Sequence, residues 1–113
     1  MTERKQALQD LLVKVEAGEW EDMEAAYKLS GINSTLVRHA YNGSLDAALA
    51  LHNAVLDNKW IVFSIDQDSA HHWYVTLSDL TGKAEVVHTG HESNLARAWL
   101  IAILKALISE EGE

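Results

Sequence analysis

Residues 59–89, KWIVFSIDQDSAHHWYVTLSDLTGKAEVVHT, decide the fold, because their apolar residues alternate with a period of two. Three short segments are rich in β-branched and aromatic residues: Lys59–Asp66, His71–Ser78 and Lys83–Thr89. The stretches between them, DQDSA and DLTG, have the composition of turns. We predict that the three segments pair as an antiparallel meander.

Alternation along these strands predicts a core face and a mixed face. The core face collects Ile61, Phe63, Ile65, Trp73, Val75, Leu77, Ala84 and Val86. The mixed face holds Trp60, Val62, Ser64, His72, Tyr74, Thr76, Glu85 and Val87. Either an N-terminal helix covers this second face, or Trp60 and Tyr74 make it a contact surface, since interfaces favour exposed aromatic residues.

The residues before the meander have helical periodicity. A first helix begins near Thr2 and ends at Gly18, and its apolar residues Leu8, Leu11 and Val15 follow helical spacing. A second short helix is predicted over Glu21–Leu29. A third begins at Ser44, a good capping residue, and its apolar face carries His52, which we expect to be a hydrogen-bonded core histidine.

Residues 93–109, capped by Ser93 or Asn94, form a long hydrophobic helix that is apolar nearly all round, so it should be buried on more than one side. We expect its Trp99 to contact Trp73, Phe63 and Val75 of the sheet. The predicted fold is a single α+β domain, residues 1–113, in which residues 1–58 are mostly helical and residues 59–89 form the sheet. The three-stranded antiparallel β-meander is predicted to pack with the N-terminal helices and with the long C-terminal helix.

Composition excludes several classes of protein. The chain has 113 residues, 48% of them hydrophobic and 23% charged, which is typical of one globular domain. Since it has no cysteine, it cannot hold a disulfide, a thiolate zinc site or a cysteine nucleophile. Its net charge of −8 argues against binding nucleic-acid phosphates. No apolar run approaches the ~20 residues of a membrane span, and the first ten residues lack a signal peptide, so we expect a cytoplasmic protein.

Four stretches resemble a known family. They are QALQDLLVKVEAGE at residues 6–19, SLDAAL at residues 44–49, the Trp-containing hairpin at residues 60–77 and the Ala- and Leu-rich helix at residues 95–108. The chain resembles the small phage and prophage proteins grouped as the phage ABA sandwich domain. The resemblance implies a phage or prophage origin and a setting in the bacterial cytoplasm, and it carries over no catalytic residue.

Histidines and carboxylates gather near the predicted strands: His71, His72, His88, His91, Asp66 and Asp68. Such side chains bind divalent metals, but their spacing fits no known ligand pattern, and the adjacent His71 and His72 point to opposite faces of a strand. We therefore expect no metal and no cofactor. Phosphate-binding and hydrolase motifs are also missing from the sequence, so we expect no catalytic residues and no enzymatic activity.

An acidic segment begins at the end of the first predicted helix and consists of Glu16, Glu19, Glu21, Asp22 and Glu24. It could be a solvated helix junction that keeps the protein soluble. Alternatively, it presents negative charge to a basic partner, as a protein that mimics nucleic acid would.

The C-terminal helix predicts a homodimer. Ile101, Leu104 and Ile108 form an apolar stripe that a monomer would leave in water, with Arg97 and Lys105 at its rim. The competing interpretation is that the N-terminal helix covers this stripe within one chain.

Three functions remain open at this point. We predict a small acidic phage-derived protein that binds another protein, including a role as inhibitor of a CRISPR-Cas or other nucleic-acid-handling complex by charge mimicry. The alternatives are an accessory or structural phage oligomer without inhibitory role, and a small metal-dependent enzyme using the histidine-rich strands. We expect a protein partner, such as a basic nucleic-acid-binding host protein, and neither direct nucleic-acid binding nor a membrane.

Overall fold

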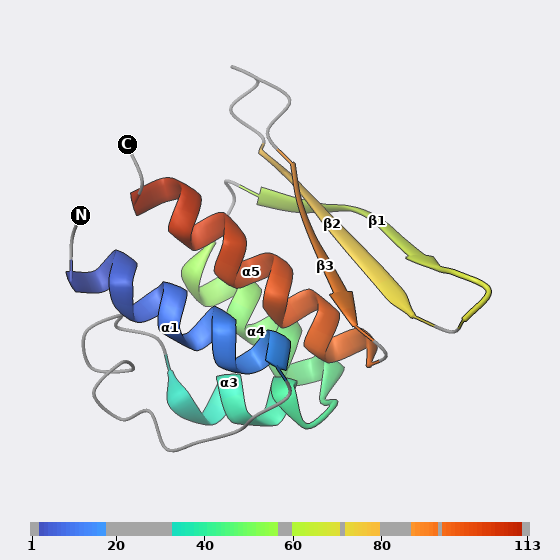
Figure 1. Cartoon of the computed structure of the whole chain (residues 1–113), viewed down its shortest axis with the longest axis horizontal. Helices are drawn as coiled ribbons and strands as arrows, with labels where there is room; N and C mark the ends of the chain where they lie inside the picture. The colour runs from blue at the N-terminus through green and yellow to red at the C-terminus, as the bar shows by residue number, and fades with distance from the viewer. Residues whose placement is uncertain are drawn as a thin grey trace.

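The structure, a computed structural model, describes residues 3–17, 33–56, 60–70, 72–79, 87–92 and 94–111. Its helices are α1 (Glu3–Ala17), α3 (Ser34–Tyr41), α4 (Leu45–Val55) and α5 (Leu95–Glu111). Its strands are β1 (Trp60–Gln67), β2 (Trp73–Asp79) and β3 (Val87–Glu92). Figure 1 shows the sheet on one side of α5 and the other helices on its opposite side. None of the described helices is both long and apolar enough to cross a membrane.

Helix α5 is the central element of the fold. It packs against β2 and β3 on one side, and against α1, α3 and α4 on its others. Its buried side chains therefore go all round the helix: Ala96, Ala98, Trp99, Leu100, Ile101, Ala102, Ile103, Leu104, Ala106 and Leu107. Each fully buried Leu or Ile contributes about 1.5–3 kcal/mol, so α5 holds a large share of the core. The prediction that this helix is buried on more than one side is confirmed.

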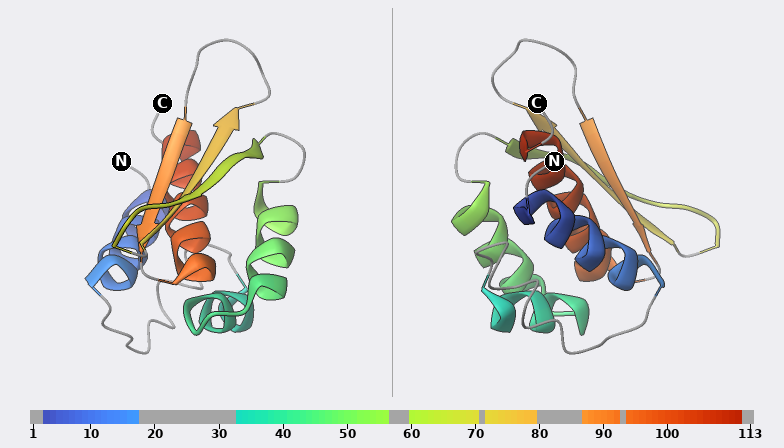
Figure 2. Two further views of the ribbon diagram at one scale, coloured as in Figure 1. Left: turned by 90° about the vertical axis from the view of Figure 1, so that its right-hand side faces the viewer. Right: turned by 60° about the vertical axis from the view of Figure 1, so that its left-hand side comes forward.

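The predicted fold was wrong in its architecture. Helices account for 71% of the described regular structure, and the described N-terminal helices pack on α5 and on one another without extensive contact with the sheet. The physical reason is that α5 offers apolar surface on every side, whereas the central strand β2 fully buries only alternate residues, Val75 and Leu77. The chain is α+β only in the general sense, with the sheet as an outer layer on a helical body (Figure 2).

The described strands are antiparallel and lie in the order β1-β2-β3. The predicted third segment, Lys83–Thr89, overlaps β3 at residues 87–89, and its first four residues lie outside the described residues. Its predicted end was wrong, because pairing with β2 continues to Glu92. The register between β1 and β2 also shifts by one residue between Val62 and Ser64, which is a β-bulge.

Side-chain caps explain where α4 and α5 begin. Ser44 caps α4, as predicted, because its Oγ accepts a hydrogen bond from the Ala47 N–H at 3.1 Å. Of the two predicted caps for α5, the structure favours Asn94, whose Oδ1 accepts from the Arg97 N–H at 3.1 Å. Gly43 precedes Ser44 with a φ of 108°, where a side chain would be strained and a Cβ would lie 3.0 Å from Asn94 Nδ2.

Replacing Ser44 with Ala should lower the free energy of unfolding by about 1 kcal/mol, since one N–H of the first turn of α4 loses its acceptor. Urea denaturation measures this loss. Ser44→Asn, which keeps a side-chain acceptor, is the control and should stay near wild type. Equal stability of wild type and Ser44→Ala would show that the cap does not support α4.

Helix α3 was not predicted. Its cap, Asn33, accepts hydrogen bonds from the N–H groups of Thr35 and Leu36. Val37, Ala40 and Tyr41 are buried against the rest of the core. The helix predicted at Glu21–Leu29 lies outside the described residues.

Candidate protein-binding surface

The turn between β1 and β2 is organised by the side chain of Asp68. Its Oδ1 accepts hydrogen bonds from the N–H groups of Ala70 and His72, both at 2.9 Å. The Asp68 N–H in turn donates to the His72 carbonyl at 3.0 Å. A carboxylate that accepts two backbone N–H groups in this way is a turn-forming device of Asp. These hydrogen bonds hold the Asp68 side chain in a fixed orientation in the turn.

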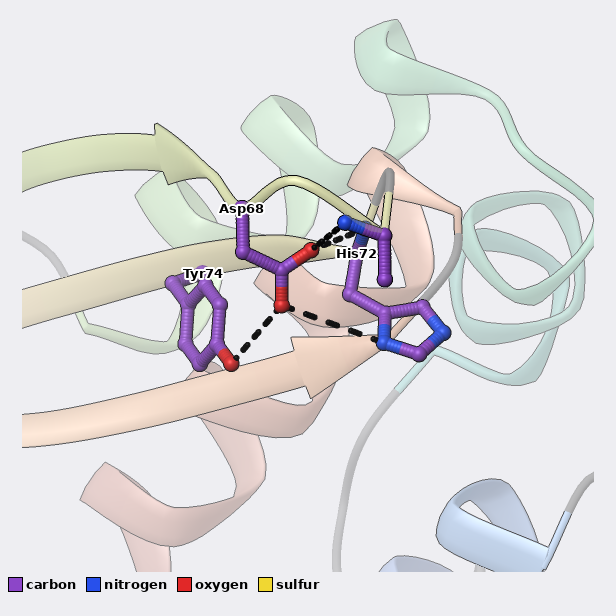
Figure 3. Close-up of polar contacts among 4 residues, drawn as sticks. Asp68, His72 and Tyr74 are labelled. Carbon is purple, nitrogen blue, oxygen red and sulfur yellow. Dashed lines mark hydrogen bonds and ion pairs between the residues drawn. The ribbon is translucent and has the colours of Figure 1, made fainter.

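The second oxygen of Asp68 joins two side chains of the β2 segment (Figure 3). Oδ2 accepts a hydrogen bond from the Tyr74 hydroxyl at 3.1 Å. It also lies 4.0 Å from His72 Nδ1, an ion pair when the imidazole is protonated. We call Asp68, His72 and Tyr74 the hairpin cluster. The Asp68 and His72 side chains are 33% and 45% exposed, so the cluster is accessible to a partner.

Hydrogen bonding lowers the pKa of the Asp68 carboxyl and raises the pKa of the Tyr74 phenol. The backbone N–H of His72, followed by the Tyr74 hydroxyl and the Ala70 N–H, lowers the pKa of Asp68, although partial desolvation opposes them. The hydrogen bond to Asp68 raises the pKa of the Tyr74 phenol. At neutral pH the cluster therefore presents an ionised carboxylate and a neutral phenol.

Carboxyl-carbon NMR titration should give Asp68 a pKa below its ordinary value of 3.8. The pKa of Asp68 should rise in Tyr74→Phe, which removes one hydrogen bond to the ionised form. Because folding favours the carboxylate, Asp68 contributes stability above pH 3.8, and this contribution is lost as the pH falls through the lowered pKa. The pKa of Tyr74 should fall toward 10.0 in Asp68→Asn. An Asp68 pKa at or above 3.8 would contradict the cluster's geometry.

The cluster lies beside the sheet face that points away from α5. Val75 and Leu77 of β2 are fully buried, whereas the alternate residues Tyr74 and Thr76 are half-buried. Within the described part of the chain, no helix covers this outer face, because the extensive contacts of α1, α3 and α4 are with α5 and with one another (Figure 2). Of the two predicted alternatives, the described residues favour an open contact surface.

The backbone register does not place position 60 on the same face as Tyr74, and the predicted role of Trp60 and Tyr74 as a contact surface stays a prediction. Position 60 pairs with Asp79, which lies on the same face of β2 as Leu77 and Val75. Tyr74 lies on the other face of β2 and pairs with Asp66. The bulge is the reason, because one extra residue in β1 reverses the alternation beyond it. The sequence shows no signal for a bulge at this point.

The acidic segment is described only at Glu16, which lies 3.8 Å from Lys105 of α5 in an exposed ion pair. Exposed pairs of this kind contribute about 0–1 kcal/mol to stability. The other predicted members, Glu19, Glu21, Asp22 and Glu24, lie outside the described residues. Their predicted role in binding a basic partner therefore stays a prediction.

The predicted dimer stripe is not exposed on α5. Ile101 and Leu104 are fully buried within one chain, and Ile108 is partly buried against the core. Helix α1 packs on α5 and buries its own Leu8, Leu11 and Val15, which was the competing interpretation. A dimer interface at Ile101, Leu104 and Ile108 is thus corrected to an intrachain core.

Two long-range contacts of α5 were also missed. Arg97, predicted at a dimer rim, places its guanidinium 4.0 Å from the ring centre of Tyr41, and its Nε donates to the Tyr41 carbonyl at 3.0 Å. The buried Trp99 donates its indole N–H to His52 Nδ1 at 3.2 Å, which confirms His52 as a hydrogen-bonded core histidine. The partners of these two contacts are separated by 56 and 47 positions in the chain, so no local sequence pattern indicates that they meet.

The described residues hold no group of three or more His, Asp or Glu side chains placed to bind a metal ion. What the hairpin cluster offers is a fixed negative charge beside a phenol and an imidazole, a combination suited to recognising a cation. Comparison with family models, with curated proteins and with solved structures finds no match for this chain.

Proposed function

We propose that this chain is a non-enzymatic binding protein that captures a basic protein through the hairpin cluster. The observation that carries the proposal is the Asp68 carboxylate, which is ionised, held by the turn and accessible beside an open sheet face. A carboxylate fixed in advance loses little conformational freedom when it pairs with an Arg side chain. Tyr74 adds an aromatic group of the kind that dominates binding energy in interfaces.

The net charge of −8 supports a basic partner over an acidic one. Long-range attraction would speed the encounter and make it sensitive to salt. The resemblance to phage proteins leads us to propose a phage-derived inhibitor in the bacterial cytoplasm. Its first targets to test are nucleic-acid-handling complexes, including CRISPR-Cas. On this proposal the acidic segment Glu16–Glu24 adds to the net negative charge that attracts the partner.

Affinity capture from bacterial lysate tests this function with three immobilised proteins: wild type, Asp68→Asn and Asp10→Asn. Asp10 is an exposed residue of α1, which makes no extensive contact with the strands, so the Asp10→Asn control removes the same charge from a different element. We expect wild type and the control to retain a basic, nucleic-acid-binding protein that high salt releases. Asp68→Asn should bind this protein at least about tenfold more weakly, a loss of about 1.4 kcal/mol.

Two results would contradict the proposal. One is equal capture of the same protein by wild type and Asp68→Asn, since the cluster would then be dispensable. The other is the absence of any basic protein from the wild-type eluate at low salt.

A further inference from the structure

Strand β1 is an open edge of the sheet in the part of the chain that the structure describes. The strand order is β1-β2-β3, and β1 makes extensive contact with β2 alone, whereas α5 packs on β2 and β3. Figure 1 shows the β1–β2 hairpin extending away from α5, with its turn clear of the described helices. Because the bulge between Val62 and Ser64 interrupts the ladder, the regular open edge consists of residues 64–67. We call these four residues the β1 edge.

Both faces of the sheet are accessible at the β1 edge. Ile65 pairs with Val75 and therefore points to the α5 side, yet Ile65 is 45% exposed where Val75 is fully buried. The reason is that α5 makes no extensive contact with β1. Asp66 pairs with Tyr74 on the outer face of the sheet, and it is exposed as well. A further strand along this edge would thus meet an apolar side chain on one face and a carboxylate on the other.

The backbone of the β1 edge has hydrogen-bonding groups that point away from β2. The Asp68 N–H donates to the His72 carbonyl at 3.0 Å, so residues 66 and 68 are the ones that turn their N–H and C=O groups toward β2. In an antiparallel ladder this direction alternates from one residue to the next. The N–H and C=O groups of Ile65 and Gln67 therefore face outward, where a further strand can bond to them.

Charge selects the kind of strand that fits this edge. Asp66 is the one charged residue among residues 64–67, and Asp68 follows it two positions later on the same face. A second copy of the chain fits poorly, because twofold pairing here brings two Asp66 carboxylates together and the net charge of −8 repels it. Edges that must stay unpaired often carry Lys or Pro, and residues 64–67 have neither.

We propose that the basic partner binds as an extended segment that adds a fourth strand, antiparallel to β1, along the β1 edge. This inference rests on the proposed function, which supplies the basic character of the partner, and it adds the shape of the segment that is recognised. Backbone hydrogen bonds to Ile65 and Gln67 hold the segment. Its basic side chains, at alternate positions, face Asp66 and Asp68. The residues between them are apolar and lie on the same side of the sheet as Ile65.

A short capped peptide of alternating Arg and Val is the probe, titrated into the labelled chain and followed by NMR. We expect the amide signals of Ile65 and Gln67 to shift, and we expect Asp66→Asn to bind more weakly. N-methylation of the Val residues removes the peptide N–H groups that face β1, so it should weaken binding at least about tenfold. N-methylation of the Arg residues removes only N–H groups that face away from β1, and this matched control should bind like the parent peptide.

Gln67→Pro makes the same test from the side of the chain. Proline has no N–H, and the Gln67 N–H points away from β2, so the β1–β2 ladder loses no hydrogen bond. Gln67→Ala keeps the N–H and is the control. We expect Gln67→Pro to bind the peptide at least about tenfold more weakly than Gln67→Ala, while the amide signals of α5 stay as in wild type.

Equal binding of the two N-methylated peptides, or of the two Gln67 variants, would overturn strand addition. Peptide-induced shifts around Asp68 in the same titrations would then leave capture through the hairpin cluster intact. A wild-type chain that does not bind the Arg and Val peptide would also overturn strand addition, whereas the proposed function fails only if the lysate capture fails.

Discussion

Replacing Trp99 with Ala should lower the free energy of unfolding by about 3–5 kcal/mol, the range for removing a large buried aromatic side chain. Trp99 is only 9% exposed, and its ring meets His52 edge to face at 5.9 Å between centres. The substitution also removes the indole donor of the buried hydrogen bond to His52 Nδ1. Urea denaturation followed by circular dichroism measures the loss.

Trp99→Phe separates packing from hydrogen bonding. Phenylalanine keeps much of the aromatic volume but has no N–H, so His52 Nδ1 loses its indole donor, at a cost of about 1–3 kcal/mol. Trp99→Ala should therefore be clearly less stable than Trp99→Phe. A loss below 1 kcal/mol for Trp99→Ala would place this side chain outside the core.

Replacing Leu104 with Ala should cost about 2–5 kcal/mol, because Leu104 is fully buried within the single chain. This result distinguishes the intrachain core from the predicted dimer interface. A Leu104 that served only as an interface residue would change self-association and leave the stability of the isolated chain nearly intact. Urea denaturation at low protein concentration, where any dimer has dissociated, makes the comparison.

Val13→Ala is the matched control for Leu104→Ala, since it shortens an apolar side chain that is 62% exposed. Its stability should stay within about 0.5 kcal/mol of wild type, as surface substitutions usually do. If Leu104→Ala were as stable as Val13→Ala, α1 would not cover α5 in the way described.

Local patterns were sufficient to predict several features of the fold. The apolar run of α5 predicted a helix buried on more than one side, because a helix without a polar face cannot face water. Ser44 predicted the start of α4, since a capping side chain acts on residues next to it in the chain. His52 was predicted as a core histidine from its place on an apolar helix face.

The arrangement of these elements could not be predicted in the same way. Both the sheet and the N-terminal helices need an apolar partner, and only the structure shows that each uses a different side of α5. Helix α3 was missed because it is only eight residues long, between its caps Asn33 and Asn42, and buries only Val37, Ala40 and Tyr41. So few apolar residues do not establish a helical period. Ile101 and Leu104 were predicted at an interface because the sequence does not show which element of the chain packs over them.

Of the hairpin cluster, only Tyr74 was predicted as a contact residue. Tyr74 and His72 were placed on the mixed face, and Asp68 was placed in a turn. Nothing in the sequence indicates that one carboxylate would accept two backbone N–H groups and the Tyr74 hydroxyl. These bonds depend on the turn that joins β1 to β2, and the bulge that separates Trp60 from Tyr74 depends on the pairing of the same strands.

Hydrogen exchange of the chain with and without the captured basic protein tests the central claim most directly, namely that the hairpin cluster is the binding surface. Bound partner should slow exchange of the backbone amides between Ser64 and Ser78, around the Asp68 turn, and should leave those of α4 unchanged. Protection confined to the helices, with the amides of Ala70, His72 and Tyr74 exchanging as in the free chain, would contradict it.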